Sequence, residues 1–499
     1  MNARIRTAPA VLALAALMLA APGPAAEVSD VWFEATLAGA AMGYLHETVV
    51  RSEDGQLTMT VESDFTMRRG ADLVAVKGVD EWVESANGLP LSYRQTRKMA
   101  IETIELEVTV APDKLRLRKS DGRDAVFSTV PHDGDFLFPR AIEALHVSKG
   151  LVPGAEYSFK AFDQDFEEIT TYAVRVVGEE QLDILGEARD AVKLIMTSDL
   201  YEGIEFIEWR SKDGALLREE APEVGISRQL TSRDAALRER EAADILTASR
   251  VATNVSLRSA GDVDDALYEI WVEGEDVSDF LIEDLRQRIE GTTDRGVLLR
   301  VSREVPAPGT TINFPVRSTP LKDYLDGNPL MQTWHPRLLG TAAKSVWGAN
   351  NDTWQGAIQI ERWVYDYVEH KGMGVAFASA REVQERMSGD CSEHAILMAA
   401  MTRSLSIPTK VASGVVHTNG EFAYHMWVEV WTGEEWFALD PTIGDGSVDA
   451  THIKLAESAI PGGRVAELSL GIMRYFNRLG VNIVEYTAGG DTVSTPAQQ

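Results

Sequence analysis

From about Val31 to Glu219, the hydrophobic and polar positions of the chain alternate with period two. In TIELEVTV, residues 103–110, every second residue is apolar and the residues between are polar. QLTMTVES, residues 56–63, follows the same pattern, and turn sequences such as APDK separate these runs. The pattern is typical of antiparallel strands that bury one face and expose the other. We therefore predict an antiparallel β-rich domain over residues 27–235.

A smaller β-containing segment is predicted over residues 236–318. The charged stretch DAALREREAADIL, residues 234–246, has a helical pattern and marks the boundary. ALYEIWVEG and GVLLRVSREV are the clearest strands of the segment. Pro306 and Pro308 then indicate a looser connection to the C-terminal region.

Residues 319–499 have a different pattern, in which helices and strands mix. NDTWQGAIQIERWVYDYVEH predicts a helix with Asp352 as its N-cap. SAREVQERMSG predicts a second helix, with Ser379 and Glu382 as a capping box and Gly389 as the stop. KVASGVVH, YHMWVEVW and EWFALDPT alternate as strands do. The predicted fold class is therefore α+β, with a central buried helix packed on an antiparallel sheet.

The stretch GDCSEHAILM contains Cys391, the only cysteine of the chain. Asp390 and Glu393 have the spacing of a capping box, so a helix is predicted to begin at Cys391. Residues 395–401 are apolar or small, which indicates a helix buried on all sides. The helix dipole favours an anionic sulfur by only about 0.3–1 kcal/mol. The two acidic side chains oppose it, so a reactive thiol here needs a cationic partner; otherwise Cys391 is an inert buried residue.

The sequence YHMWVEVWTGEEWFALDPT predicts a β-hairpin. A two-residue loop at Thr432-Gly433 would pair Trp431 with Glu434, Glu429 with Trp436, Trp427 with Ala438, His425 with Asp440, Met426 with Leu439 and Val428 with Phe437. Thr-Gly is not the preferred turn sequence, and a longer loop would change the pairing. A shift of two residues keeps His425 and Asp440 diagonal on one face, whereas a shift of one residue separates them.

A carboxylate on one imidazole nitrogen fixes the tautomer and makes the other nitrogen more basic. Cys391, His425 and Asp440 are therefore the candidate nucleophile, base and orienting acid. Each also has an ordinary structural interpretation, since strand histidines are often packed or at the surface and Asp-Pro commonly starts a turn.

No metal or cofactor is predicted. His394 lies one helical turn after the cysteine, but Cys-x-x-His without a second thiol or a close histidine pair is a poor zinc pattern. His417 and His452 are interpreted as structural or solvent-facing.

The run GDCSEHAILMAAMTRSLSIPTKVASGVV, followed by YHMWVEVW and WFALDPT, resembles the core of the transglutaminase-like superfamily, which is related to papain-like cysteine proteases. The resemblance covers about Trp354 to Thr451. Ser-Ile-Pro at residues 406–408 stands where many members have Gly-Ile-Pro. The resemblance implies that Cys391 is the nucleophile, His425 the general base and acid, and Asp440 the orienting acid.

The expected chemistry is acyl transfer through a thioester. We predict an amidase or peptidase that hydrolyses a peptide or protein amide. Transglutaminase-type cross-linking to an amine is one alternative, and a non-catalytic module that binds peptide or cell-wall material is another.

Composition narrows the choice of partners. The chain has 499 residues, of which 44% are hydrophobic and 25% charged, as in globular proteins. Its formal charge of −29 repels phosphate backbones and anionic lipids, so nucleic acid is not an expected partner. The oligomeric state is left open.

The N-terminus predicts export. Arg4 and Arg6 precede the apolar stretch APAVLALAALMLAA, and PGPAA offers a cleavage site near Ala25 or Ala26. We predict a signal peptide over residues 1–26 and a periplasmic or secreted protein. No stable membrane insertion is expected after cleavage, although an uncleaved anchor is the alternative.

Overall fold

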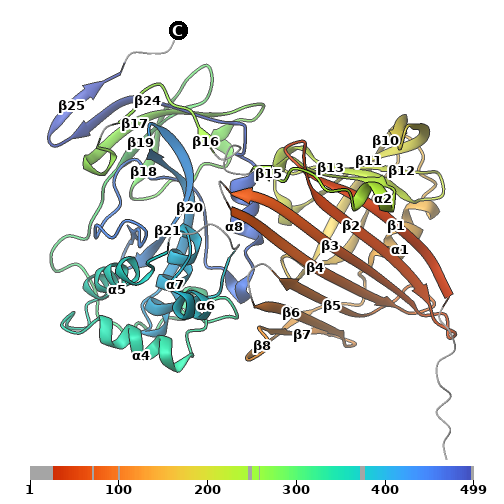
Figure 1. Ribbon diagram of the computed structural model, residues 1–499, viewed down its shortest axis with the longest axis horizontal. Helices are drawn as coiled ribbons and strands as arrows, with labels where there is room; N and C mark the ends of the chain where they lie inside the picture. Colours follow the sequence, from red (N-terminus) through yellow and green to blue (C-terminus); the bar gives the residue numbers. More distant parts are fainter. Residues whose placement is uncertain are drawn as a thin grey trace, which may run out of the picture.

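The computed structural model describes residues 26–69, 72–98, 102–244, 250–257, 259–370 and 377–495. The predicted signal peptide therefore lies outside the described residues, apart from Ala26. The fold is α+β, as predicted, and its strands form three sheets that are antiparallel except for the short β15 (Ala243–Asp244), which pairs parallel with β3. Figure 1 shows a large N-terminal sheet beside a C-terminal unit of helices and smaller sheets. No helix among the described residues combines the length and apolarity needed to cross a membrane.

The N-terminal sheet follows one path, from β8 through β7 to β1 and then from β14 down to β9. Its strands are β1 (Ala26–Leu37), β2 (Ala40–Arg51), β3 (Leu57–Arg69), β4 (Asp72–Glu84), β5 (Pro90–Lys98), β6 (Thr103–Val110), β7 (Lys114–Ser120), β8 (Ala125–Pro131), β9 (Glu156–Asp163), β10 (Glu168–Ile184), β11 (Glu187–Ser198), β12 (Phe206–Arg210), β13 (Leu216–Ala221) and β14 (Ile226–Thr231). The helix α1 (Pro139–Ser148) connects β8 to β9.

The period-two pattern explains how this sheet forms its core. In β6, Leu106 and Val108 are buried while Glu105 and Thr109 are exposed. The buried side chains of β2 to β7 form one cluster, which also includes Phe162 at the opposite end of the strand order. The sheet therefore curves until its two halves face each other, with the apolar face inside.

The C-terminal unit contains two five-stranded sheets. One holds β16 (Arg250–Val251), β20 (Thr409–Thr418), β21 (Glu421–Trp431), β22 (Trp436–Leu439) and β23 (Ile453–Ser458). The other holds β17 (Val263–Val272), β18 (Gln287–Thr292), β19 (Val297–Ser302), β24 (Leu479–Ala488) and β25 (Asp491–Ser494). Because β17 pairs with β24, the strands of residues 263–302 share a sheet with the C-terminal end of the chain. The predicted division near residue 318 stays a prediction.

The helices of this unit are α4 (Pro336–Ser345), α5 (Thr353–Tyr367), α6 (Ala380–Arg386), α7 (Cys391–Ser404) and α8 (Ala466–Met473). Every residue from 395 to 401 is fully buried, so α7 is the central helix that its apolar sequence predicts. It packs against α4, α5 and α6 on one side and against β20 and β21 on the other.

Two local predictions about helices are wrong. The described residues 234–244 of this stretch do not form one helix: α2 (Arg233–Ala236) is a single turn, and β15 (Ala243–Asp244) pairs with β3. Pairing with the end of β3 has overridden helix propensity there. The stop of α6 is Met387, in the left-handed conformation with φ of 54°, and not Gly389.

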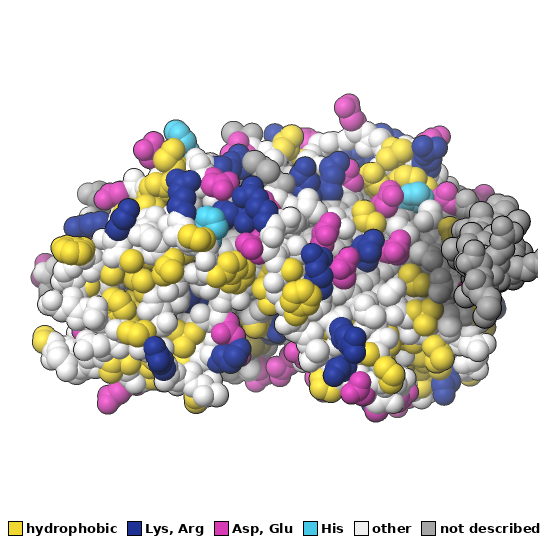
Figure 2. Space-filling model, turned by 90° about the horizontal axis from the view of Figure 1, so that it is seen from below, with side chains coloured by type: hydrophobic (Ala, Val, Ile, Leu, Met, Phe, Trp, Pro, Cys, Tyr) yellow, Lys and Arg dark blue, Asp and Glu magenta, His cyan; other side chains and the backbone are white. Residues whose placement is uncertain are grey.

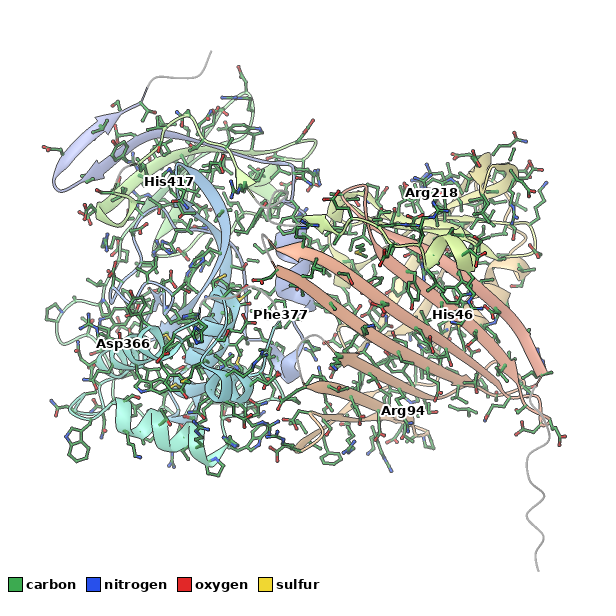
Figure 3. All side chains as sticks on the ribbon, viewed as in Figure 1. His46, Arg94, Arg218, Asp366, Phe377 and His417 are labelled. Atoms are coloured by element: carbon green, nitrogen blue, oxygen red, sulfur yellow. The ribbon has the colours of Figure 1, made fainter. Side chains whose placement is uncertain are left out.

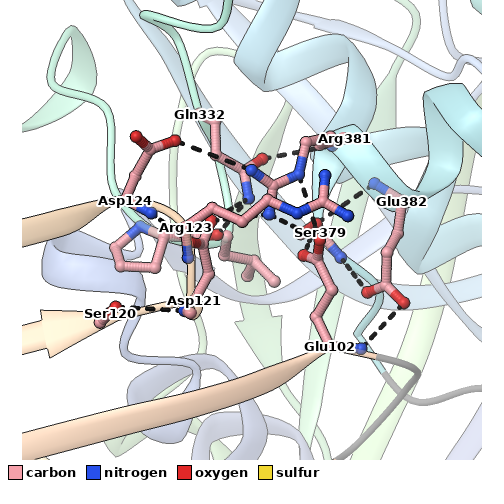
Figure 4. A network of polar contacts seen from close by, with 12 residues as sticks. Glu102, Ser120, Asp121, Arg123, Asp124, Gln332, Ser379, Arg381 and Glu382 are labelled. Carbon is pink, nitrogen blue, oxygen red and sulfur yellow. Dashed lines mark hydrogen bonds and ion pairs between the residues drawn. The ribbon is translucent and has the colours of Figure 1, made fainter.

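A polar cluster joins the N-terminal sheet to α6 (Figure 4). Arg381, in the first turn of α6, is 1% exposed. Its guanidinium donates to Glu102 Oε1 at 2.6 Å and to Asp121 Oδ2 at 3.0 Å. Ser379 Oγ donates to the other oxygen of Glu102 at 2.7 Å, and the N–H of Glu102 donates to Glu382 at 3.1 Å. The N-terminal unit thus contributes two carboxylates to the beginning of α6.

Arg381→Met tests how strongly this cluster joins the two units. The substitution leaves two buried carboxylates without their cation, so we expect the free energy of unfolding to fall by about 3–5 kcal/mol. Arg123→Met is the matched control, because Arg123 is largely exposed and lies 3.6 Å from an exposed carboxylate of Glu385. Its effect should stay within about 0.5 kcal/mol. Urea unfolding measures both, and equal losses would contradict the buried role of Arg381.

Candidate active site

Cys391 occupies the first position of α7 and is partly exposed. The predicted capping box is confirmed. Asp390 Oδ1 accepts the N–H of Ser392 at 2.8 Å, and Glu393 Oε2 accepts the N–H of Asp390 at 2.9 Å. The helix therefore begins at the cysteine, where backbone N–H groups have no acceptor within the helix.

Gly389 has a packing role in place of the predicted stop signal. A Cβ at this position would lie 2.2 Å from Cβ of Glu393 and 2.6 Å from its Cγ. The Glu393 side chain crosses over Gly389 to reach the amide of Asp390, so the capping box needs a residue without a side chain there.

The segment before α7 is held from both ends. Glu393 Oε1 accepts the N–H of Ala378 at 3.0 Å, and the adjacent Ser379 caps α6 and binds Glu102 of the N-terminal unit. Figure 3 labels Phe377, which precedes these residues on the side of the C-terminal unit that faces the large sheet. The carboxyl group of Glu393 therefore connects the first turn of α7 to the junction of the two units.

The hairpin of β21 and β22 forms, but its predicted register is wrong by two residues. Trp431 pairs with Trp436, Val430 with Phe437, Glu429 with Ala438 and Val428 with Leu439. The turn is centred on Gly433 and Glu434, closed by the N–H of Thr432 donating to the carbonyl of Glu435. Gly433 has a φ of 131°, which favours glycine at the first turn position. The shift keeps the parity of the strands, so His425 and Asp440 are diagonal neighbours on one face.

His425 Nε2 donates to Asp440 Oδ2 at 2.8 Å. Cys391 lies close enough to His425 to act on its pKa through charge and hydrogen bonding, and Nδ1 is the ring nitrogen that does not bind Asp440. Burial alone would lower the pKa of His425. The charges of Asp440 and Cys391 outweigh it and hold that pKa well above its usual range. The structure thus brings all three predicted residues together, with His425 hydrogen-bonded to Asp440 and next to Cys391.

Asp440 has a second imidazole neighbour that the sequence reasoning missed. His452 is fully buried, with Nε2 3.4 Å from Asp440 Oδ2 and Nδ1 3.3 Å from Asp449 Oδ1. Burial opposes protonation of His452, but its hydrogen bonds to Asp440 and Asp449 raise its pKa. A hydrogen bond to each of two carboxylates requires a proton on both nitrogens. The only signal in the sequence was Asp449, three residues before His452.

The surroundings of Asp440 keep it ionised. Burial would raise its pKa, but the charge of His425 and hydrogen bonds from His425 and His452 hold the pKa well below its usual range. Asp440 Oδ1 also accepts the N–H of Thr442 at 2.8 Å. The indole of Trp427 is fully buried and lies 6.4 Å from the His425 ring and 5.4 Å from the His452 ring, between centroids.

Glu361 of α5 is a further acidic residue at this site. Its Oε1 accepts the N–H of Asp440 at 3.1 Å, and its Oε2 accepts the N–H of Gly446 at 2.9 Å. Burial, followed by the charge of Asp440, raises the pKa of Glu361 to about 8. Glu361 is therefore largely uncharged at neutral pH, and it positions the backbone on both sides of the turn after β22.

The remaining histidines have structural contacts. His394 Nδ1 lies 2.6 Å from the carbonyl oxygen of Asp390, one turn earlier in α7. His417 is 4% exposed, and its Nε2 accepts the N–H of Leu257 at 3.3 Å, so it does not face solvent.

In the part of the chain that the structure describes, one group of residues has donor atoms close enough for a metal ion. Atoms of His425, Asp440 and His452 lie within 4.8 Å of one another. The Asp440 oxygen that a metal would use already accepts hydrogen bonds from both rings, so hydrogen bonding accounts for the cluster. The absence of a metal requirement stays a prediction.

The comparison with family models identifies one segment. Residues 340–441 match the transglutaminase-like superfamily. The predicted transglutaminase-like core is thereby confirmed for this segment, which contains Cys391, His425 and Asp440. His452 lies beyond its end.

Two solved structures are similar to parts of the chain. A presumed cysteine protease from Cytophaga hutchinsonii is 16% identical, with 47% of this chain and 86% of that chain covered and a TM-score of 0.29. A β-barrel-like protein of a domain of unknown function from Brucella abortus is 12% identical, with 40% of this chain and 94% of that chain covered and a TM-score of 0.32. No curated protein matches the chain.

Gly389→Ala tests the packing that lets α7 begin at Cys391. The added methyl group overlaps Glu393, so we expect a loss of about 1–3 kcal/mol in the free energy of unfolding. Gly340→Ala in α4 is the matched control, because a Cβ there meets nothing within 4 Å. The control should be neutral or stabilising by up to about 1 kcal/mol. Urea unfolding checks both values, and a neutral Gly389→Ala would refute the packing role.

Proposed function

We propose that this protein is an exported cysteine-dependent acyl-transfer enzyme that hydrolyses amide bonds of a peptide or protein. The observation that carries the proposal is that Cys391, His425 and Asp440 lie together, with His425 hydrogen-bonded to Asp440 and influenced by Cys391. A partly exposed thiol beside a protonated imidazole, itself held by a buried carboxylate, has the parts of an activated nucleophile. The match of residues 340–441 to the transglutaminase-like superfamily supports the same chemistry.

In the first half of the proposed reaction, the Cys391 thiolate attacks the carbonyl carbon of the amide. A carbon–sulfur bond forms, and the electron pair of the carbonyl moves to its oxygen. When that oxygen re-forms the carbonyl, the carbon–nitrogen bond breaks. The imidazolium of His425 gives its proton to the leaving amine, which leaves a thioester on Cys391 and a neutral imidazole.

In the second half, water resolves the thioester. Neutral His425 takes a proton from the attacking water, whose oxygen bonds to the thioester carbon. The carbon–sulfur bond then breaks, which releases a carboxylic acid and restores the thiolate–imidazolium pair. With an amine in place of water, the same steps form a new amide and give cross-linking.

Backbone position supports stabilisation of the negative oxygen. The N–H of Cys391 is at the first position of α7, where helical amides point outward and the dipole favours an anion. We assign this N–H as one donor to the oxyanion. A preorganised donor of this kind typically accounts for about 3–4 kcal/mol of transition-state stabilisation.

His452 has a positioning role in this proposal. It contacts Asp440 and is fully buried, so we assign it to act through Asp440 and not on substrate. A protonated His452 holds Asp440 in its negative form, and Asp440 in turn keeps His425 protonated.

Other parts of the chain support the proposed location and substrate class. The predicted signal peptide at residues 1–26 supports export to the periplasm or beyond. Lys and Arg side chains are interspersed with Asp and Glu on the face seen in Figure 2. With the formal charge of −29, this favours a peptide or protein substrate over nucleic acid.

Thiol alkylation against pH tests whether Cys391 is activated. The raised pKa of His425 keeps the imidazolium present at neutral and mildly acidic pH, and it is lost only as the pH rises through that raised value. The sulfur beside it should therefore react with iodoacetamide near pH 5.5 at least about tenfold faster than a small-molecule thiol. Mass spectrometry of the intact protein, sampled at timed intervals, gives the rate.

Two variants serve this experiment. His425→Gln should abolish the acidic reactivity, whereas His46→Gln, on a strand of the N-terminal sheet, should leave it unchanged. Alkylation of the unmodified protein no faster than the free thiol at pH 5.5 would rule out an activated nucleophile.

The reaction itself is tested with a peptide library, with and without added amines. Hydrolysis predicts products that have gained one water, and cross-linking predicts adducts that carry the amine. Cys391→Ala should reduce either product by about 10³-fold or more, because the covalent step is lost. Mass spectrometry of the products distinguishes the outcomes. Product formation unchanged in Cys391→Ala, or none with any peptide despite an alkylation-active thiol, would contradict the proposed enzyme.

A further inference from the structure

A cavity of about 550 Å³ lies inside the curved N-terminal sheet. Side chains from both halves of the sheet and from α1 line it, and Leu470 of α8 reaches it from the C-terminal unit. The apolar part of the lining includes Leu45, Met59, Trp82, Phe159 and Met196. A volume of this size is within the range of about 300–1,000 Å³ that is typical of small-molecule sites.

The cavity is lined by more acidic than basic side chains. Seven carboxylates and three guanidiniums line it. Each guanidinium has its own carboxylate: Arg97 is 2.7 Å from Asp80, Arg210 is 2.6 Å from Glu208 and Arg228 is 2.7 Å from Glu219. No lining arginine is therefore left to neutralise the remaining acidic groups.

Three lining carboxylates form no direct ion pair within the described residues. Glu47 is 9% exposed, and within the described residues its side chain makes no hydrogen bond or ion pair. Asp163 accepts the hydroxyls of Tyr172 and Tyr201 at 2.8 and 2.7 Å, but no cation lies within ion-pair distance among the described residues. Asp165 lines the cavity and is likewise unpaired in the described part of the chain.

Two of these three carboxyl groups have a raised pKa. Burial raises the pKa of Glu47, although three nearby arginines oppose the shift. Asp165 is exposed, but the protein around it, followed by the charge of Asp163, raises its pKa to about 6 against the opposing charges of Arg97 and Lys119. A carboxylate kept from bulk water without a counter-ion is unfavourable, so a positive group that entered the cavity would be stabilised there.

The aromatic and aliphatic side chains of the lining suit a molecule that joins a positive group to an apolar chain. Trp82, Phe159, Tyr172 and Tyr201 present aromatic rings to the cavity, and aromatic faces attract ammonium groups. The aliphatic and methionine side chains offer no hydrogen-bond partner and favour a hydrocarbon chain.

We propose that this cavity binds an amphipathic cation, a molecule with an ammonium head and an apolar chain. The head lies near Asp163 and Asp165, Glu47 adds a further negative charge to the wall of the same cavity, and the chain packs on the apolar wall of the curved sheet. This site is separate from Cys391 and does not depend on acyl transfer.

Calorimetric titration with three probes of equal chain length tests the proposal. Dodecylammonium carries the required charge, dodecanoate the opposite charge and dodecyl maltoside none, each below its micelle concentration. The full chain with Cys391→Ala is used, so that no amine can react at the thiol. We expect dodecylammonium to bind at least about tenfold tighter than dodecanoate.

The variant Glu47→Gln with Asp165→Asn removes charge at nearly constant shape and should bring the two affinities within about threefold. Asp113→Asn, on an exposed turn of the same unit, is the matched control and should change neither. Circular dichroism checks the fold of each variant.

The unmodified cavity gives an independent measurement. The pKa of Asp165 is raised to about 6, and the charged groups that act on it are Asp163, Arg97, Asp80 and Lys119. Its charge is present above that pH, so the affinity for dodecylammonium should fall as the pH is lowered through 6. Equal or tighter binding of dodecanoate, no binding of any probe, or an affinity indifferent to both the charge variant and pH would each overturn the proposal.

Discussion

The buried charge of Asp440 is the constraint on which the arrangement around Cys391 depends. Asp440 is 2% exposed, and an unpaired carboxylate in such a place would cost several kcal/mol. Two imidazoles and one backbone N–H meet it instead. Burial by itself would deprotonate His425, so the negative charge of Asp440 is what keeps that ring positive and able to stabilise the sulfur of Cys391.

Neighbouring carboxyl groups respond to the same surroundings in the opposite way. Burial raises the pKa of Glu361, and that of Glu393, to about 8, because neither has a cation and each lies beside another acid. Both still accept two backbone N–H groups, so they position the chain without adding a full negative charge. The site can therefore hold Glu361 and Glu393 close to Asp440 and Cys391, while Asp440, which is paired with histidine, stays ionised at neutral pH.

Local patterns could be predicted from the sequence, and contacts between distant segments could not. The spacing of Asp390 and Glu393 is enough to start α7 at the cysteine, since a capping box is satisfied within four residues. The face of the hairpin on which each residue lies could also be predicted, because successive side chains of a strand point to opposite faces. Its register was not, because the position of Gly433 in the turn decides it. His452 and Arg381 escaped prediction because their partners come from separate loops and, for Arg381, from the other unit.

The contacts of Glu102 show why the N-terminal sheet matters to the thiol. Glu102 binds Ser379 and Arg381 at the start of α6, and the residue before Ser379 donates its N–H to Glu393. Glu393 in turn holds the amide of Asp390, directly before Cys391. Each link is a hydrogen bond to a buried or partly buried carboxylate, and such groups are costly to leave unpaired. A displacement of the N-terminal sheet would therefore either break one of these bonds or move the first turn of α7. The curved sheet is thus part of what positions the nucleophile, in addition to enclosing a cavity of its own.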